Sequence, residues 1–320
     1  MNKSSGETVG QELLECIEER GPWPFITRRV FQDAAQVEQI WESRRHRKGL
    51  GKGAADNVEG WLWAPGNLNW WIGSIFAIGS SFFAVGSILL LAPALAKAWS
   101  LSASDINLIY FLGSIPFTTA AYLQLYQSAN APEFQQVSAE RRRSFFGWKP
   151  KDIGWLSCAL QFIGTLLFNL NTFDGMNTSL SWLQQDLAIW IPDILGSIFF
   201  LASGYLAFVE TCHAHGAWKP RDLSWWITII NLMGCIGFMV AAIFAIILPG
   251  PAHPEMATIA IVFTLQGAIC FFLGSVLMLP EIASRDSSGR IDGKAEGRSG
   301  APSGQKLTSY SFNEFDSSKA

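Results

Sequence analysis

The sequence predicts an all-α membrane protein with six transmembrane helices, arranged as three tandem repeats of two helices. Three observations support this fold class: charged residues are scarce, six segments are long and apolar enough to span a bilayer, and a short motif recurs three times. Only 15% of the 320 residues are charged, against about 25% in soluble domains. Most of these charges fall in residues 1–60 and 282–320, and the long stretch between them is apolar.

Six apolar segments have the length that a membrane helix requires, which is about 20 residues for about 30 Å of hydrocarbon. Continuous apolar runs of this length exclude the alternating pattern of a β-barrel, and a helix in lipid satisfies its own backbone hydrogen bonds. The predicted spans are residues 69–91, 106–127, 153–173, 190–209, 223–248 and 257–280.

Basic residues predict the orientation of these spans, because short cytosolic loops carry an excess of Lys and Arg. They cluster before the first span and in the second–third and fourth–fifth loops, whereas the other loops together contain only Lys97. The clustered residues are Arg44, Arg45, Arg47, Lys48, Lys52, Arg141, Arg142, Arg143, Lys149, Lys151, Lys219 and Arg221. We therefore expect both termini to be cytosolic and the protein to lie in the bacterial inner (cytoplasmic) membrane.

A repeated motif at the start of the first, third and fifth spans defines the three units. The sequence WKPKDIGW at 148–155 matches WKPRDLSW at 218–225, and a weaker copy, WAPGNLNW, occurs at 63–70. Pro suits a helix entrance, and Asp or Asn can cap the first backbone N–H groups. We assign the repeats to residues 61–131, 148–213 and 218–281.

A glycine recurs at an equivalent place in all six spans and is followed four residues later by phenylalanine. Small residues on one helix face let helices approach closely in lipid. We expect these glycines to pack helix against helix, which is a structural role. They are Gly79, Gly113, Gly164, Gly196, Gly234 and Gly267.

Asp193 is the one charged residue inside a predicted span, and a charge there is expensive enough to suggest a function. The equivalent positions of the other units hold Tyr110 and Thr264, so this candidate intramembrane site is polar in all three. However, Pro192-Asp193 also resembles an ordinary helix start near the outer boundary. Two interpretations stay open: a capping or water-facing acid, which we favour, and a site for a solute or a proton.

Glu210 and Glu281 end their helices at the predicted cytosolic side, where the helix dipole disfavours negative charge. The equivalent residue of the first unit is Gln127. We expect an ionic layer in which nearby cations compensate the two acids; a cytosolic gate or binding site is the alternative. The basic residues closest in sequence are Lys149, Lys219 and Arg221.

The sequence carries no motif for catalysis, nucleotide binding or metal binding. The stretch from Cys212 to His215 has suitable residue types for a metal, but its spacing matches no common zinc pattern. No histidine lies within a predicted span, which argues against haem held between helices. The net charge of −3 gives no case for nucleic acid. We expect no cofactor, no metal site, no catalytic residue and no enzymatic activity.

The two ends of the chain differ in composition from the spans. We expect residues 1–60 to form a cytosolic segment that is mainly helical, because Val30, Ala34, Val37 and Trp41 fall at helical spacing. An amphipathic helix over residues 30–44 could lie on the membrane surface or in solution. Residues 282–320 are rich in Ser, Gly and Lys and predict a disordered cytosolic tail.

The two-helix unit, with Gly-Ser-Ile-Phe-Phe at 196–200, resembles the YrhK-like family of small bacterial membrane hairpins. The stretch WESRRHRK at 41–48 and the Leu-Pro-Glu ending at 279–281 resemble longer proteins that carry such units. The resemblance covers about residues 41–281 and implies helical hairpins with no assigned activity and no site residues. The first unit departs from the family pattern, since Ala64 replaces the Lys and Asn67 the Asp.

These observations favour a non-catalytic membrane scaffold or partner-binding protein that contacts the lipid bilayer and either a homo-oligomer or another membrane partner. The alternative is a transporter or channel for a small solute or a proton. Gln161, Asn231 and Gln266 lie inside spans and suit interhelical hydrogen bonds, although a polar pathway would also use them. We expect the choice to depend on whether Asp193 and its two equivalents line one cavity.

Overall fold

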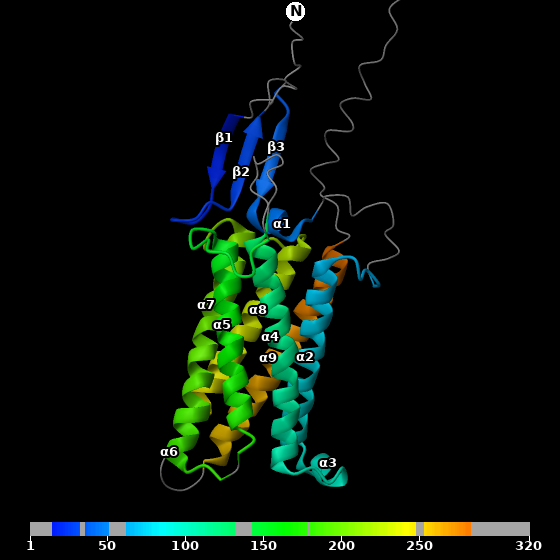
Figure 1. The fold of residues 1–320 in the computed structure, drawn as a ribbon, viewed down its shortest axis with the longest axis vertical. Helices are drawn as coiled ribbons and strands as arrows, with labels where there is room; N and C mark the ends of the chain where they lie inside the picture. Colours follow the sequence, from blue (N-terminus) through cyan, green and yellow to red (C-terminus); the bar gives the residue numbers. More distant parts are fainter. Residues whose placement is uncertain are drawn as a thin grey trace, which may run out of the picture. The chain divides into compact units, whose positions relative to one another are not determined.

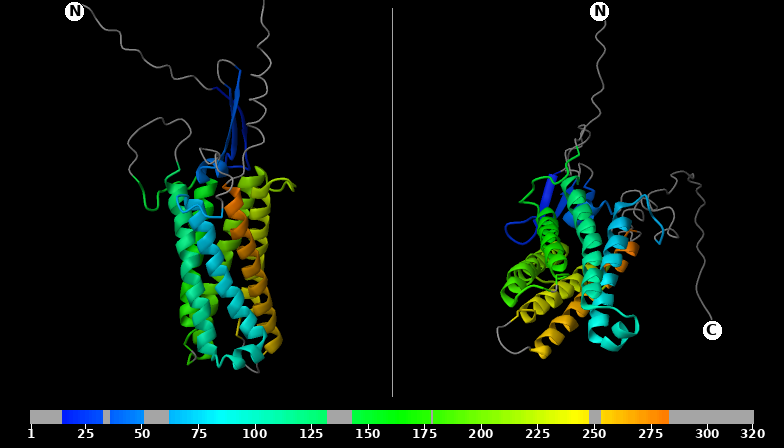
Figure 2. Two further views of the ribbon diagram at one scale, coloured as in Figure 1. Left: turned by 90° about the vertical axis from the view of Figure 1, so that its right-hand side faces the viewer. Right: turned by 60° about the horizontal axis from the view of Figure 1, so that its bottom comes forward.

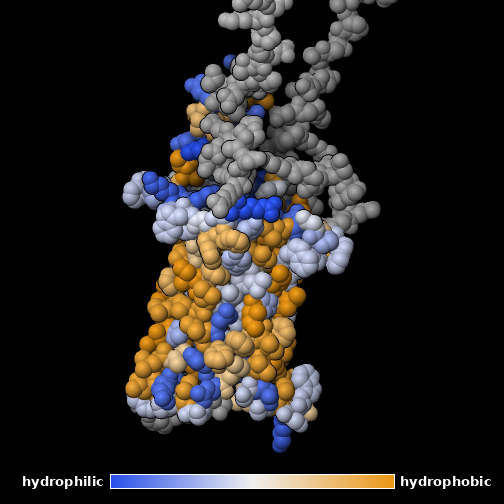
Figure 3. Space-filling model, in the orientation of Figure 1, coloured by the Kyte–Doolittle hydropathy of each residue, from blue (hydrophilic) through white to orange (hydrophobic). Residues whose placement is uncertain are grey.

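The structure, a computed structural model, describes residues 15–32, 36–50, 62–131, 143–177, 179–247 and 253–282. Within these residues, six helices are long and apolar enough to cross a membrane. The six spans predicted from hydropathy are confirmed to this extent, although several helices extend beyond the predicted boundaries. On the face drawn in Figure 3, apolar side chains cover the length of the helices, and hydrophilic ones gather chiefly near the two ends.

The six long helices follow one another along the chain, with the short helix α3 between the first two. The fourth is one continuous run from Trp182 to Cys212, which begins as α6, passes through a turn of π-helix called η2 and continues as α7. The helical elements are α2 (Leu68–Leu91), α3 (Pro93–Ala98), α4 (Ala103–Ala129), α5 (Ile153–Asp174), α6 (Trp182–Gln185), η2 (Asp186–Trp190), α7 (Ile191–Cys212), α8 (Leu223–Phe244) and α9 (Pro254–Glu281).

The three helices that follow the repeated motif begin in the same way. The side chains of Asn67, Asp152 and Asp222 each accept a hydrogen bond from the backbone N–H two residues on, over 2.8–2.9 Å. This satisfies donors that the first helical turn leaves free. Three indole nitrogens then donate to carbonyl groups of the preceding loop, over 2.8–3.0 Å: those of Trp70, Trp155 and Trp225.

The six long helices form a closed ring in chain order. Helix α2 packs on α4, α4 on α5, α5 on α7, α7 on α8 and α8 on α9, and α9 returns to α2. Successive helices run in opposite directions (Figures 1 and 2). The short helix α1 (Ser43–Lys48) lies at one end of the bundle, and α3 and α6 lie at the other. We call these the α1 end and the α3 end.

The six recurrent glycines lie in pairs where α2 crosses α4, α5 crosses α7 and α8 crosses α9. In each pair, a Cβ added to one glycine would lie 2.9–3.1 Å from the carbonyl oxygen of the other. Backbones this close leave little room for a side chain. The pairs are Gly79 with Gly113, Gly164 with Gly196, and Gly234 with Gly267.

Seven buried phenylalanines fill the middle of the bundle. Their rings meet mainly edge to face; the centroids of Phe117 and Phe271, for example, are 5.8 Å apart with an interplanar angle of 89°. This geometry is favoured by the charge distribution of aromatic rings. The set is Phe76, Phe83, Phe117, Phe168, Phe200, Phe238 and Phe271, and we call it the phenylalanine layer.

The described N-terminal residues correct the prediction of a mainly helical segment. They form an antiparallel sheet in the order β1 (Glu15–Arg20), β2 (Arg28–Gln32) and β3 (Glu38–Glu42), which leads directly into α1. The all-α fold class therefore holds for the bundle but not for the segment that precedes it.

Two strands occupy most of the range in which an amphipathic helix was predicted. Val30 pairs with Ile40 and Arg29 with Trp41 across these strands, and the Arg29 guanidinium lies 5.7 Å from the Trp41 ring centroid. Adjacent β-branched and aromatic residues suit strands, and this preference overrides the helical spacing. Residues 1–14, 33–35, 51–60 and 283–320 lie outside the described residues, and with them nearly all of the predicted disordered tail.

Candidate functional site

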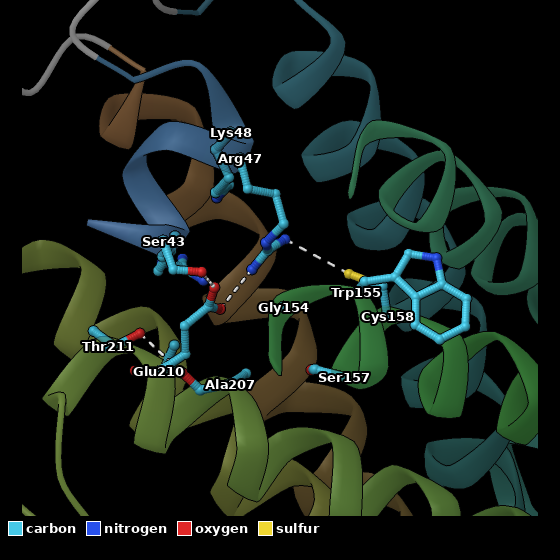
Figure 4. Close-up of polar contacts among 12 residues, drawn as sticks. Ser43, Arg47, Lys48, Gly154, Trp155, Ser157, Cys158, Ala207, Glu210 and Thr211 are labelled. Atoms are coloured by element: carbon cyan, nitrogen blue, oxygen red, sulfur yellow. Dashed lines mark hydrogen bonds and ion pairs between the residues drawn. The ribbon is translucent and has the colours of Figure 1, made fainter. Parts of the chain in front are cut away.

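A carboxylate that ends α7 is buried against α1 at the α1 end of the bundle. Arg47 Nη2 donates to Glu210 Oε2 over 2.7 Å, and Ser43 Oγ donates to Glu210 Oε1 over 2.6 Å (Figure 4). Ser43 and Arg47, both in α1, lie more than 150 residues before Glu210 in the chain. A buried charge is tolerated only when it is paired and hydrogen-bonded. Ser43 and Arg47 provide these bonds, and through them Glu210 holds α1 against α7.

Glu281, at the end of α9, is bound by other residues of α1. Arg44 Nη2 donates to Glu281 Oε1 over 2.9 Å, and Lys48 forms an ion pair with Oε2. Ser224 of α8 also donates to Oε1, over 2.7 Å. Glu281 is fully buried, like Glu210. The two acids and three cations form what we call the α1 ionic cluster.

Gln127, at the end of α4, completes this arrangement without a charge. Its Nε2 donates to Asn69 Oδ1 over 3.0 Å, and Asn69 Nδ2 donates to the backbone carbonyl of Lys48 over 2.8 Å. Helix α1 is therefore bonded to residues of α2, α7 and α9.

Gly154, in the first turn of α5, leaves the space that Arg47 occupies. A Cβ at this position would lie 2.6 Å from Glu210 Oε1 and closer still to Arg47 Nε. The same position, two residues after the capping residue, is Asn69 in α2, which bonds to the Lys48 carbonyl of α1, and Ser224 in α8, which bonds to Glu281. Glycine is therefore required in α5 because α1 inserts its guanidinium there.

The structure corrects the partners predicted for Glu210 and Glu281. Lys149 donates to the carbonyl of Ala131 over 3.3 Å, Lys219 donates to that of Thr211 over 3.0 Å, and Arg221 is exposed. The two lysines thus bind carbonyl groups near helix C-termini. The carboxylates face inward, where α1 reaches them.

The partners of the two acids are instead Arg44, Arg47 and Lys48 of α1, which were predicted only to indicate the orientation of the spans. Their spacing of three and four residues places them on one face of a helix. This spacing is the pattern in the sequence that indicates a common binding surface for the three cations, and the prediction did not use it.

Burial opposes the positive charges of α1. For Arg47 burial lowers the pKa of the guanidinium, but Glu210, Cys158 and Asp152 together outweigh it and raise this pKa above its ordinary value. For Lys48 burial dominates and lowers the pKa of the ammonium group to about 8, against the attraction of Glu281. Both cations therefore depend on the carboxylates beside them to hold their charge in this buried position.

A cavity of about 70 Å³ lies next to α1 and is lined by residues of all six long helices, which places it on the bundle axis. Arg44, Arg47 and Lys48 form part of its wall, together with amide side chains. This is room for a few water molecules, since one needs about 10–15 Å³. Gln124, Gln127, Gln161 and Asn231 supply the amides. Gln266 does not line this cavity and donates to the Met233 carbonyl over 3.2 Å.

The phenylalanine layer separates this cavity from a second one. Phe76, Phe200 and Phe271 line the cavity at the α1 end, whereas Phe83, Phe168 and Phe238 line the cavity at the α3 end. The gap between them measures about 10 Å³, which is no larger than one water molecule requires. The layer thus interrupts any continuous path of water along the axis.

The cavity at the α3 end has a volume of about 460 Å³ and contains all three residues of the predicted intramembrane polar site. Asp193, Tyr110 and Thr264 come from α7, α4 and α9, and all line this space. Tyr110 Oη and Ser87 Oγ share a hydrogen bond of 2.8 Å, and Asn171 lies within hydrogen-bonding reach of the Asp193 carboxylate. We call this space the Asp193 cavity.

The structure contradicts the interpretation of Asp193 as a capping residue of its own first turn. The helical run begins at Trp182, with Ser181 as its N-cap, so that Asp193 lies about three turns inside it. The preceding turn is the π-helix η2, which ends two residues before Pro192, and Pro192 has no N–H to donate. Turns of π-helix inside α-helices occur frequently at functional sites.

The histidines and cysteines do not form a metal site within the described residues. His213 bonds to Thr27 Oγ1 over 3.0 Å and lies 3.5 Å from Glu42, and His215 stacks on Tyr205. The stretch from Cys212 to His215 therefore contacts the N-terminal segment and its own helix.

The fold and the two cavities define a polytopic helical membrane protein with polar spaces along its axis. In comparisons with known proteins, no family model matches this chain, and no curated protein or solved structure was found to match it. The resemblance to the YrhK-like family stays a prediction.

Proposed function

We propose that this chain is a membrane transport protein that moves a small solute along the axis of its helix bundle. The observation that carries the proposal is that Asp193, Tyr110 and Thr264 line one cavity. Ionisable residues in membrane helices that face a cavity are typical of solute and ion pathways. The glycine crossings, which favoured a scaffold, explain how the helices approach one another but not why a polar cavity is retained.

Two barriers close the proposed pathway in this conformation. The phenylalanine layer occupies the middle of the bundle, and α1 covers the cavity at the α1 end. Transport requires both to move. The α1 ionic cluster suits such a gate, because water molecules can take the place of the ion pairs of Glu210 and Glu281 when α1 moves away.

We infer that the bundle consists of three tandem two-helix repeats over residues 61–131, 148–213 and 218–281. Three features that recur at equivalent positions support this: the capping residue, the indole bond to the preceding loop, and the glycine pair at the crossing. The residues that end the second helix of each unit, Gln127, Glu210 and Glu281, also all contribute to the hydrogen bonds around α1.

We infer further that the α1 end faces the cytosol of a bacterial cell, with the protein in the inner membrane and both termini cytosolic. The excess of Lys and Arg at this end supports the orientation. A transporter in this orientation receives solute in the Asp193 cavity from the outside.

Flux through purified protein in liposomes tests the proposed function. The probes are methylammonium, glycine, glycerol, acetate and protons, each measured against liposomes that lack protein. We expect at least one of them to move faster with the protein and Asp193→Asn to abolish this flux. A second measurement uses Thr264→Cys in a chain without native cysteines, whose thiol should react with a water-soluble reagent. A chain that moves none of the five probes and protects this thiol is a scaffold.

A further inference from the structure

The charged residues at the α3 end are almost all acidic. Among the described residues there, the basic side chains are limited to Lys97 and His253, which are both exposed, and His253 lies 3.9 Å from the Glu255 carboxylate. The acids are Asp105, Asp174, Asp186, Asp193 and Glu255. A charge of one sign around the mouth of a cleft raises the local concentration of oppositely charged solutes. The field at this end therefore attracts cations.

Within the Asp193 cavity the same sign prevails. Asp193 is the one carboxylate among its described lining residues, and no Lys, Arg or His lines it. Asn171 can donate a hydrogen bond to this carboxylate but carries no charge. A carboxylate in a membrane cavity without a basic partner is expensive, and a bound cation would neutralise it.

The remaining walls of the cavity distinguish between kinds of cation. Five aromatic side chains line it, and the face of an aromatic ring attracts an organic cation. A divalent metal ion instead prefers several oxygen ligands with more than one carboxylate, and the described residues contain no such group. The volume of about 460 Å³ falls within the range of small-molecule sites, about 300–1,000 Å³. The aromatic residues are Phe83, Tyr110, Phe168, Trp190 and Phe238.

We propose that the Asp193 cavity binds a small organic ammonium cation, with the Asp193 carboxylate balancing its charge and the aromatic side chains surrounding its carbon atoms. This inference names the substrate class of the transport function proposed above. It rests on that proposal for the claim that the bound cation is transported. The binding itself is a separate property.

The binding test compares choline with 3,3-dimethylbutanol, in which a carbon atom replaces the charged nitrogen. The protein is purified as the full chain, and binding is measured by the ligand-dependent rise of its melting temperature. We expect choline to bind at least about tenfold more tightly than its neutral analogue. Asp193→Asn should remove this preference. Glu38→Gln, which removes an exposed carboxylate on β3, should keep it.

A second variant keeps Asp193 in place, in case Asp193→Asn does not fold. In a cysteine-free chain, Thr264→Cys places a thiol in the cavity wall. A cationic thiosulfonate should modify it at least about tenfold faster than an anionic one of similar size, and choline should slow this reaction. Equal rates for both reagents, or no protection by choline, would overturn the inference.

The outcomes separate the two proposals. If choline binds through Asp193 and no probe crosses the membrane, the cation site stands and the transport function falls. If glycerol or acetate moves and choline does not bind, transport stands and the cation class falls. Proton flux that depends on Asp193 without choline binding makes Asp193 a proton site, which also overturns the cation class.

Discussion

Arg47 in α1 places its guanidinium 2.7 Å from the carboxylate of Glu210 in α7, a residue 163 positions further along the chain. Their side chains are 7% and 0% exposed. The pair therefore joins the segment that carries the sheet to the interior of the helix bundle. Its burial makes each partner dependent on the other, since an unpaired charge at this depth is costly.

Removing one partner of this pair should destabilise the protein strongly. We expect Arg47→Met to leave Glu210 unpaired, at a cost of about 3–5 kcal/mol, and to lower the melting temperature of the purified protein. The double variant Arg47→Met/Glu210→Leu should recover most of this loss, because it removes both charges. Arg45→Met is the control: Arg45 is partly exposed, and surface pairs contribute about 0–1 kcal/mol. Equal losses at Arg45 and Arg47 would contradict the buried-pair argument.

Gly154→Ala should displace α1, although alanine normally stabilises a helix by up to about 1 kcal/mol relative to glycine. The new Cβ would meet both Arg47 and Glu210. Cys158 reports the displacement, because it is buried and accepts a hydrogen bond from Arg47 Nη1 over 3.6 Å.

With Cys158 as the single remaining cysteine, we expect a maleimide to react faster in Gly154→Ala than in the parent. Gly216→Ala is the matched control, since nothing lies within 4 Å of its added Cβ. If both variants react at the parental rate, Gly154 does not hold the space for Arg47.

Hydropathy was sufficient to locate the six spans, because lipid leaves an apolar chain of this length one solution, the helix. The glycine spacing likewise indicated the helix crossings. The partners of Glu210 and Glu281 could not be found in this way, because loop lysines lie nearer in sequence and only the fold brings α1 to the end of the bundle. The strands were missed because Val30 and Trp41 fit a helical period as well as two short strands.

Asp193 shows a different limit of sequence analysis. Proline next to an acid is typical of a helix start, and the pattern suggested that role. The helix instead begins nine residues before Ile191, at Trp182, and η2 accommodates Pro192 in its interior. A π-turn depends on packing around it, and no local pattern in the sequence indicated one.

The glycine crossings should differ in their tolerance of a methyl group. A Cβ at Gly79 would lie 2.6 Å from Phe117 Cδ2 and 2.9 Å from the Gly113 carbonyl, whereas one at Gly196 would lie 3.2 Å or more from its neighbours. Overpacking of this kind costs about 1–3 kcal/mol. We expect Gly79→Ala to lower the melting temperature clearly more than Gly196→Ala, with Gly66→Ala, which meets nothing within 4 Å, as the reference. The reverse order would show that the α2–α4 crossing adjusts freely.

Cysteine labelling on intact cells tests the orientation. In a background without native cysteines, single cysteines at Asp174 or His253, both at the α3 end, should react with an impermeant thiol reagent. A cysteine at Ala217, between α7 and α8, should react only after the membrane is opened; Ser138, which lies outside the described residues, should behave in the same way. Labelling of Ala217→Cys alone would place the α1 end outside.

Asp193→Asn should separate the roles of the Asp193 cavity in folding and in transport. The amide nearly preserves the size of the side chain and removes its charge, and the continuous helix around it needs no cap at this position. We therefore expect the variant to keep the elution volume of the parent in size-exclusion chromatography and a similar melting temperature. In liposomes its uptake of methylammonium should fall by at least about tenfold, while Glu38→Gln transports at the parental rate. Undiminished uptake by a folded Asp193→Asn protein would show that the solute does not depend on this carboxylate. If the variant loses both its fold and its uptake, Asp193 is a structural residue instead. Labelling of Thr264→Cys, which keeps Asp193, then tests the cavity independently.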